Sequence, residues 1–309
     1  MSDIDILDAQ EKTSRSPLHR STRVEGPRTV SSFHPEPTPV HEVVIEPRSG
    51  WIAVDWREMY TQRELLFFLI WRDIQVRYKQ TVLGSAWAVL QPLLLMLIFS
   101  FTFGRFVGDH GPAPYAVFVF AGLIPWTVFS QGFPQSALSL INQQNLLTKV
   151  YFPRLFVPTA AACVFLVDLS YALVLYMIVL WYHHYPPAWT VVFVPFLIAL
   201  TLMTTLSLGI TLAALTVFYR DFRHLVPFLV QILMFITPVI YPAWLIPEKY
   251  HYVLALNPMF GLVTAYRSAI LGYPWDFNCL LISSISAVAT FVFAIFYFRR
   301  TERAFADFA

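Results

Sequence analysis

The polar residue best placed to do chemistry in this chain is Asp168, within the apolar stretch "FLVDLSYALV". A carboxylate at the centre of a membrane helix costs at least about 2.5–3.5 kcal/mol, so it must pair, carry a proton or face other helices. Two interpretations stay open. Asp168 is a proton or ion site, or it makes a hydrogen bond between helices, for example with Ser170 or with a hydroxyl group on a neighbouring helix.

The other reactive side chains do not form a recognisable centre. His183 and His184 are adjacent, so their side chains point to different faces and a shared metal site is not expected. Cys163 and Cys279 lie in apolar stretches and match no metal-ligand spacing and no disulfide framework, so we interpret them as packing or lipid-facing residues. A membrane-embedded glycosyl- or acyltransferase would need a carboxylate or a histidine in a substrate-facing loop. Its candidates are scattered: Asp109, His110, His183, His184, Glu248 and Asp276.

Sequence motifs for nucleotide binding and hydrolysis are missing from the 309 residues. There is no G-x-x-x-x-G-K-[ST] loop, no G-x-G-x-x-G, no G-x-S-x-G and no H-E-x-x-H. We therefore expect no catalytic residue, no metal and no cofactor in this chain.

The composition indicates a membrane protein. Of the residues, 57% are hydrophobic and 13% are charged, whereas about 25% are charged in an average globular domain. The net charge of +2 gives no support to nucleic-acid binding. A bilayer core of about 30 Å needs roughly 20 apolar residues in a helix. Six segments qualify: 82–106, 115–133, 157–181, 189–218, 225–246 and 277–298.

The Lys and Arg residues between these segments indicate how the chain is oriented. They are frequent before the first segment and after the second, fourth and sixth, whereas the alternate loops contain only Arg105, Lys249 and Arg267. Cytoplasmic loops carry the excess of Lys and Arg, so both termini are predicted to be cytoplasmic. The motif "YRDFRH" at 219–224 is then a tight cytoplasmic turn.

The N-terminal part of the chain precedes the first span. Residues 1–50 are rich in proline and in mixed charge, and we expect a disordered cytoplasmic tail there. Residues 51–80 are predicted to contain an amphipathic helix at the cytoplasmic interface, beginning near Asp55. Its apolar residues recur at helical spacing: Phe67, Trp71, Ile74 and Tyr78.

The transmembrane domain is predicted to occupy 81–309, and two of its segments do not span. Residues 134–156 are predicted to be a cytoplasmic loop. Residues 247–276 contain two short apolar pieces bracketed by prolines, which favours a re-entrant helical hairpin on the outer side.

Aromatic residues in the first two spans are candidate pore residues. A ring can stack on the C–H face of a sugar, and transport needs binding that is easily released. The same rings can also be lipid-facing bulk, so both interpretations stay open. The candidates are Trp87, Phe99, Phe101, Phe118, Phe120 and Phe129.

Five blocks, in continuous order over about 56–309, resemble the permease subunit of bacterial ABC-2 type transporters, and more narrowly the exporters of O-antigen, capsular polysaccharide or teichoic acid. The blocks are "WRDIQVRYKQTVLGSAWAVLQPLLLMLIFSFTFGR", "NLLTKVYFPRLFVPTAA", "FYRDFRHLVPFLVQILMFITPVIYP", "LNPMFGLVTAYRSAILG" and "FRRTERAFADFA". The resemblance implies an interface helix, six spanning helices and two short re-entrant helices on the outer side. It also implies a homodimer with two copies of a separate ATPase, which binds ATP and Mg²⁺.

The resemblance assigns roles to three groups of residues. A coupling helix within 138–152 would contact the ATPase through Asn145, Leu146, Lys149 and Tyr151. The interface helix would gate the cytoplasmic entrance through Arg72, Asp73, Arg77 and Lys79. In the turn "YRDFRH", Arg220, Asp221 and Arg223 would either pair and anchor two helices, or be solvated charges.

The expected function is export of a lipid-linked cell-surface polysaccharide of the O-antigen type across the inner (plasma) membrane of a bacterium. Alternatives are an ABC-2 exporter of teichoic acid, a drug or a lipid, and a proton-coupled secondary transporter that uses Asp168. No inverted repeat supports the last alternative.

Overall fold

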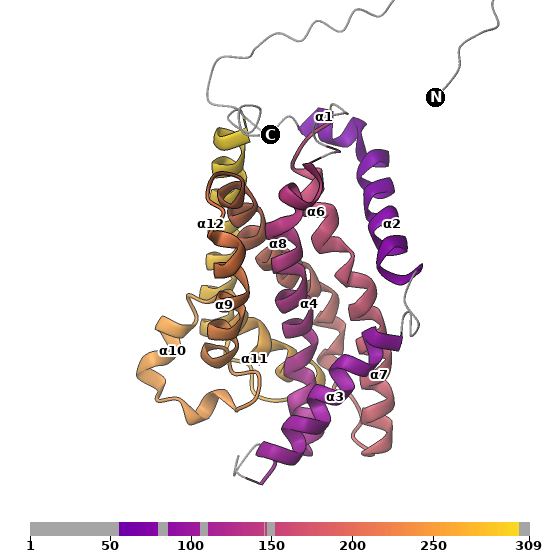
Figure 1. Ribbon diagram of the computed structural model, residues 1–309. Coiled ribbons are helices and arrows are strands. Elements are labelled where there is room, and N and C mark those ends of the chain that lie inside the picture. The colour runs from indigo at the N-terminus through magenta and orange to yellow at the C-terminus, as the bar shows by residue number, and fades with distance from the viewer. Residues whose placement is uncertain (1–55, 80–85, 106–110, 145, 147–151, 303–309) are drawn as a thin grey trace, which may run out of the picture. The chain divides into compact units, whose positions relative to one another are not determined.

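The computed structural model describes residues 56–79, 86–105, 111–144, 146 and 152–302 (Figure 1). Every regular element within these residues is helical. The protein is an all-α polytopic membrane protein, as the sequence predicts. The tail predicted at 1–50 lies outside the described residues.

The helices follow one another along the chain in this order: α1 Trp56–Thr61, α2 Arg63–Lys79, α3 Ala86–Phe103, α4 Tyr115–Asn142, α6 Phe156–Cys163, α7 Phe165–Tyr182, η1 Trp189–Phe193, α8 Val194–Phe218, α9 Phe222–Ile236, η2 Ala243–Leu245, α10 Glu248–Leu254, α11 Pro258–Leu271 and α12 Phe277–Glu302.

Five helical stretches are long and apolar enough to cross a membrane: α3, α4, α6 with α7, η1 with α8, and α12. Each corresponds to one of the predicted spans. The short helices α10 and α11 form a pair bent by 114°, which would add a sixth span only if the pair were taken as one. This pair lies where the sequence predicts two re-entrant helices. Figure 1 shows α10 and α11 at the end of the bundle opposite to α1 and the C-terminal end of α12.

The helix predicted over 225–246 requires a correction, because α9 ends at Ile236. Thr237 is extended and is followed by Pro238, whose ring disfavours a helical conformation in the preceding residue. The 15 residues of α9 rise about 22 Å, less than the core of a bilayer. The non-helical segment that follows is buried in protein at Thr237 and Val239.

Arg267 of α11 holds this non-helical segment in place. Its guanidinium donates to the carbonyl oxygens of Pro238 at 2.7 Å, Val239 at 2.6 Å and Tyr241 at 3.3 Å. It also donates to the carbonyl of Phe118 and lies 3.7 Å from the centre of that ring. Non-helical backbone at membrane depth requires such internal partners, because hydrocarbon offers none.

Helix α4 also differs from the prediction, since it continues past 133 and through Pro134 to Asn142. The first part of the segment predicted as a loop, 134–156, is therefore helical. Proline is tolerated within membrane helices because neighbouring helices satisfy the freed backbone groups. In α4, 83% of the most apolar stretch is buried, against 11% in α3, so α4 forms the centre of the bundle.

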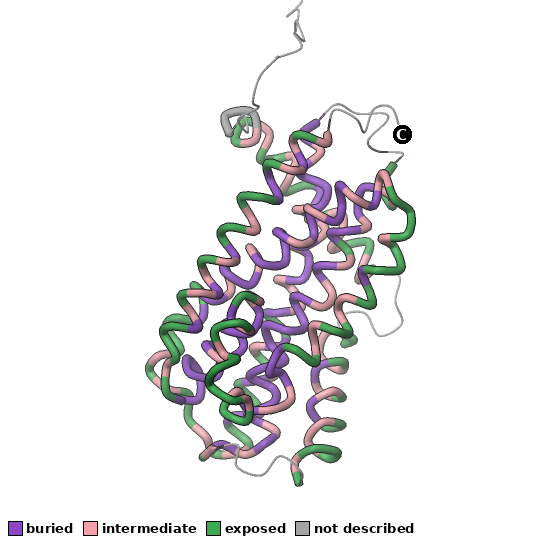
Figure 2. The backbone as a smooth tube through the Cα atoms, turned by 90° about the vertical axis from the view of Figure 1, so that its left-hand side faces the viewer, coloured by how far each residue is buried: buried purple, intermediate pink, exposed green. Residues whose placement is uncertain are grey.

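The centre of the bundle is built on a close approach between α4 and α8. A Cβ atom on Gly209 would lie 2.4 Å from the hydroxyl oxygen of Ser136, so only glycine fits there. Small residues allow this proximity in membrane proteins. The hydroxyl of Thr216 donates to the carbonyl of Ala137 at 2.9 Å across the same interface. Buried residues run through the middle of the bundle, and exposed residues gather on its outer helices (Figure 2).

Candidate functional site

Helix α2 turns charged side chains toward the bundle and large apolar side chains away from it. Phe67 and Trp71 are 70% and 53% exposed, whereas Arg72, Asp73 and Arg77 contact side chains of α4 and α7. A helix on a water-soluble protein shows the reverse pattern. Charges that face a protein interior or a water-filled cavity are typical of helices with apolar surroundings.

Asp168 of α7 forms an ion pair with Arg77 of α2. The Nη2 atom of Arg77 lies 2.7 Å from Oδ2 of Asp168 and 2.9 Å from the side-chain oxygen of Gln131. The Arg77 side chain is 33% exposed and that of Asp168 is 12% exposed. The structure therefore gives Asp168 a partner on α2. Ser170, which the sequence suggested, donates instead to the carbonyl of Val167.

Two further contacts fix this ion pair. The hydroxyl of Tyr78 donates to Oδ1 of Asp168, and the Arg77 guanidinium stacks over the ring of Phe165 at 4.5 Å. Burial and, after it, the hydrogen bond to Asp168 raise the pKa of Tyr78 above its usual range. Tyr78 therefore stays a neutral donor, and both carboxylate oxygens of Asp168 accept hydrogen bonds.

A second polar network joins α2 to the C-terminal end of α4. Arg72 donates to Asp73 at 2.7 Å and to the side-chain oxygen of Gln143 at 2.7 Å. Gln143, whose amide nitrogen lies 3.5 Å from Asp73, is the C-cap residue that follows the last residue of α4. Arg72 and Asp73 thus hold α2 to the start of the segment that leads into the predicted coupling helix.

A cavity of about 300 Å³ lies between these two networks. Its apolar wall includes Val164 and Phe165. Its polar wall combines a guanidinium, a carboxylate, carboxamides and a hydroxyl group, from Asp73, Arg77, Gln135, Ser139, Asn142 and Gln143. Pockets of this kind, mostly preformed and with a few convergent polar groups, bind small ligands or parts of larger ones.

The polar wall contributed by α4 was missed by the sequence analysis, although the sequence carries a signal for it. Gln131, Gln135, Ser139 and Asn142 recur at helical spacing and so share one face. The signal is visible only if the helix is taken past 133, and the sequence prediction ended the span there.

The other residues predicted for the entrance and for ATPase coupling are placed differently. Lys79 is exposed at the end of α2. Leu146 packs against a cluster that includes Leu69 of α2 and Phe156 of α6. Asn145, Lys149 and Tyr151 lie outside the described residues, so their role in coupling stays a prediction.

The turn "YRDFRH" is described in full, and it contains no ion pair. Arg220, Asp221 and Arg223 are all exposed. Backbone hydrogen bonds form the turn, from Arg223 N to Arg220 O and from His224 N to Asp221 O. The interpretation in which these charges pair with one another is not supported, which leaves solvated charge.

The six candidate pore aromatics fall into two groups. Phe118, Phe120 and Phe129 have no exposed surface, because they belong to the main hydrophobic core around α4. They therefore cannot stack on a sugar in this conformation. Trp87 and Phe101 are 52% and 90% exposed, and Phe99 is partly buried. A pore role stays a prediction for these three residues of α3.

Comparison with known families places the bundle among membrane transporters. The model of the family described as "ABC-2 type transporter" matches residues 64–271, from the start of α2 to the end of α11. The chain belongs to this family. The match contains both polar networks, the cavity and the Arg267 contacts.

Several relatives of this chain are named as polysaccharide transport proteins. The O-antigen export system permease protein RfbA of Myxococcus xanthus is 37% identical over 218 residues, which cover 69% of this chain and 82% of the relative. An RfbA of Klebsiella pneumoniae is 24% identical over 79% of this chain and 94% of its own length. The polysialic acid transport protein KpsM of Escherichia coli is 28% identical over 76% and 93%, respectively.

Proposed function

We propose that this chain is the membrane-spanning permease of an ABC transporter that exports a lipid-linked cell-surface polysaccharide of the O-antigen type across the inner membrane of a bacterium. It acts as a homodimer with two copies of a separate ATPase, which supplies the ATP and Mg²⁺ site. Both termini of the permease lie in the cytoplasm.

The observation that carries this proposal is the 37% identity to an O-antigen export permease within the ABC-2 family, over most of both chains. Two features of the sequence agree with it. The chain has no phosphate loop, so energy must come from another subunit. Lys and Arg are also concentrated in alternate loops of the sequence, which is typical of the cytoplasmic side of a membrane protein.

The geometry supports a route by which an ATPase could act on the cavity. A push on the segment after α4 would move Gln143 and Leu146. Gln143 is bonded to Arg72 of α2, and Leu146 belongs to the apolar cluster beneath α2. Movement of this segment therefore shifts α2, whose Arg77 and Asp73 line the cavity at the cytoplasmic entrance.

Proton-coupled transport through Asp168 is disfavoured by the same geometry. Arg77 donates a hydrogen bond to one oxygen of the carboxylate, and Tyr78 donates to the other. A proton carrier needs a carboxylate oxygen that is open to a proton donor in each cycle, and both oxygens of Asp168 are engaged within the bundle.

The proposal is tested by measuring the amount of glycan on the surface of cells that lack the permease. Deleting the gene for this chain, or inactivating its ATPase partner, should leave lipid-linked glycan inside the cell. Antibody or lectin labelling should then fall on intact cells and persist on permeabilised cells. The chemical class of the accumulated lipid-linked species distinguishes O-antigen-type glycan from teichoic acid, a drug or a lipid.

A control experiment varies the energy source, either ATP hydrolysis or the proton gradient. A partner ATPase that binds ATP but cannot hydrolyse it should reproduce the deletion, while collapse of the proton gradient at constant ATP should not. Normal surface labelling without a working ATPase would exclude the proposed mechanism.

A further inference from the structure

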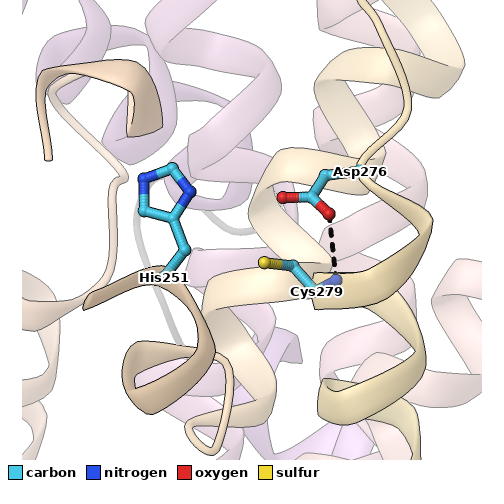
Figure 3. A group of neighbouring side chains, drawn as sticks. All are labelled: His251, Asp276 and Cys279. Atoms are coloured by element: carbon cyan, nitrogen blue, oxygen red, sulfur yellow. Dashed lines mark hydrogen bonds between the residues drawn. The ribbon is translucent and has the colours of Figure 1, made fainter. Parts of the chain in front are cut away.

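Three side chains with metal-ligating atoms converge where the short helix α10 meets the start of α12. They are His251, Asp276 and Cys279 (Figure 3), and their ligand atoms all lie within 4.8 Å of one another. The cluster combines an imidazole, a carboxylate and a thiol from two elements that are far apart in the sequence. The helix α10, which carries His251, lies at the opposite end of the bundle from α1 (Figure 1).

The tautomer of His251 is determined by its neighbours. Its Nε2 atom lies 3.1 Å from the carbonyl oxygen of Ala243 and 3.0 Å from that of Ile246. Carbonyl oxygens only accept, so Nε2 carries the proton, and Nδ1 of the neutral ring has a free lone pair. Figure 3 shows the second ring nitrogen facing Asp276 and Cys279. Metal-binding histidines commonly donate their other ring N–H to a carbonyl in this way.

The other two side chains are held in position by the start of α12. Oδ1 of Asp276 accepts a hydrogen bond from the backbone nitrogen of Cys279 at 3.0 Å, drawn as a dashed line in Figure 3. This capping contact leaves the second carboxylate oxygen to bind an ion. Cys279 is 1% exposed within a small apolar cluster, whereas Asp276 is exposed and provides access from solvent.

The contacts of Nε2 with the carbonyls of Ala243 and Ile246 orient the His251 ring, and this orientation brings Nδ1 toward both Asp276 and Cys279. We propose that His251 Nδ1, the Asp276 carboxylate and Cys279 Sγ bind Zn²⁺, with water as the fourth ligand. This mixed N, O and S set suits a borderline-soft, tetrahedral ion. Zn–N bonds of about 2.0–2.1 Å and Zn–S bonds of about 2.3 Å require ligand atoms roughly 3.3–3.8 Å apart, so the atoms close in by about 1 Å.

Charge and protons balance in this site. Binding displaces the thiol proton of Cys279 to solvent, and His251 binds the ion as the neutral ring with its proton on Nε2. A divalent ion with one carboxylate and one thiolate gives zero net charge. A neutral site is compatible with the apolar neighbours of Cys279, which include Ala255 and Phe260. The bound ion would link α10 to the start of α12 and so hold the bend between α10 and α11 in place.

Cobalt titration of the full chain tests this site. The protein is purified in detergent with an affinity tag that contains no histidine, and Co²⁺ is used as the spectroscopic probe. We expect one equivalent to bind with a thiolate-to-cobalt charge-transfer band in the near ultraviolet, and Zn²⁺ to displace it. Cys279→Ser should abolish the band, and the matched control Cys163→Ser should retain it.

Two further variants separate binding from folding. Asp276→Asn keeps an oxygen that can cap α12 but removes the carboxylate charge, and His251→Ala removes Nδ1. Each should weaken Zn²⁺ binding at least 10-fold, and Zn²⁺ should raise the melting temperature of the wild type but not of these variants. Circular dichroism and gel filtration check that they are folded.

The proposal is overturned by either of two results. One is the lack of saturable binding of Co²⁺ and Zn²⁺ to the wild-type protein. The other is a charge-transfer band and affinity that persist in folded Cys279→Ser and His251→Ala, which would assign the metal to other residues. Neither result depends on the identity of the exported substrate.

Discussion

Two arginines in this bundle have different kinds of partner for their guanidinium groups. Arg77, on α2, pairs with the Asp168 carboxylate, is one-third exposed and lines a cavity. Arg267, on α11, is 3% exposed, and no carboxylate among the described residues pairs with it. Its partners are backbone carbonyls and the Phe118 ring.

The difference separates a region that can move from one that cannot. An ion pair that is partly exposed and lines a cavity can break and be replaced by contacts with water or with a charged ligand. A guanidinium bonded to the carbonyls of a non-helical segment has no such substitute, because each freed carbonyl would stay buried without a donor. We infer that the Arg267 region is a fixed frame and that the Arg77 region is the movable part of the permease.

The largest expected effect comes from Arg267→Met. The change keeps an unbranched side chain but leaves the carbonyls of Pro238 and Val239 without their donor. Each buried carbonyl that is left without a donor costs about 1–3 kcal/mol. We expect a large drop in the free energy of unfolding, measured by denaturation in mixed detergent micelles, or a failure to accumulate in the membrane.

Two companion variants sharpen this result. Arg267→Lys should be intermediate, since an ammonium group cannot span the carbonyls that a planar guanidinium reaches. Arg220→Met, at an exposed position, should change stability by less than about 0.5 kcal/mol. If Arg267→Met were as stable as Arg220→Met, the fixed-frame interpretation would fail.

A smaller effect is expected at the ion pair, measured by a double-mutant cycle. Arg77→Met and Asp168→Asn should each cost about 1–2 kcal/mol, less than a fully buried pair because Arg77 is partly exposed. The double variant should cost less than their sum, with a coupling energy of about 1 kcal/mol. Asp221→Asn, at an exposed site, is the matched control.

Export by the same variants distinguishes the two interpretations of Asp168. Asn can still accept a hydrogen bond from Tyr78, so a structural role predicts reduced but measurable export by Asp168→Asn. Complete loss of export by a stable Asp168→Asn protein, together with sensitivity to the proton gradient, would instead favour proton coupling.

The sequence was sufficient to predict the five long spans, because each is an apolar run whose length the bilayer sets. It was insufficient where tertiary contacts decide. Pro134 lies inside α4, which continues past it, whereas α9 ends just before Pro238. The same residue type has opposite outcomes at the two places, and contacts with neighbouring helices decide between them. The partner of Asp168 could not be read from spacing either, since Arg77 lies 91 residues away on a helix that was predicted to lie at the membrane interface.

The same limit applies to the cluster at His251. The sequence analysis interpreted Cys279 as a packing residue and expected no metal, because spacing rules find only ligands that lie close together in the chain. The bend between α10 and α11 and the cap at Asp276 bring the three side chains together, and neither was predictable from composition.

The smallest effect on stability, and the most informative one for the movable region, is expected for Gln143→Leu. Leucine has a similar size but cannot accept the hydrogen bond from Arg72, so stability should fall by no more than about 1 kcal/mol. If Gln143 transmits ATPase motion to α2, export should fall several-fold while ATP hydrolysis by the reconstituted complex continues. The measurement is the amount of glycan moved per ATP in proteoliposomes.

Gln75→Leu, an exposed substitution on α2, should leave this ratio unchanged. An unchanged ratio in Gln143→Leu as well would show that α2 is driven by other contacts, such as the apolar cluster around Leu146, and would confine the role of the Arg72–Gln143 bond to stability.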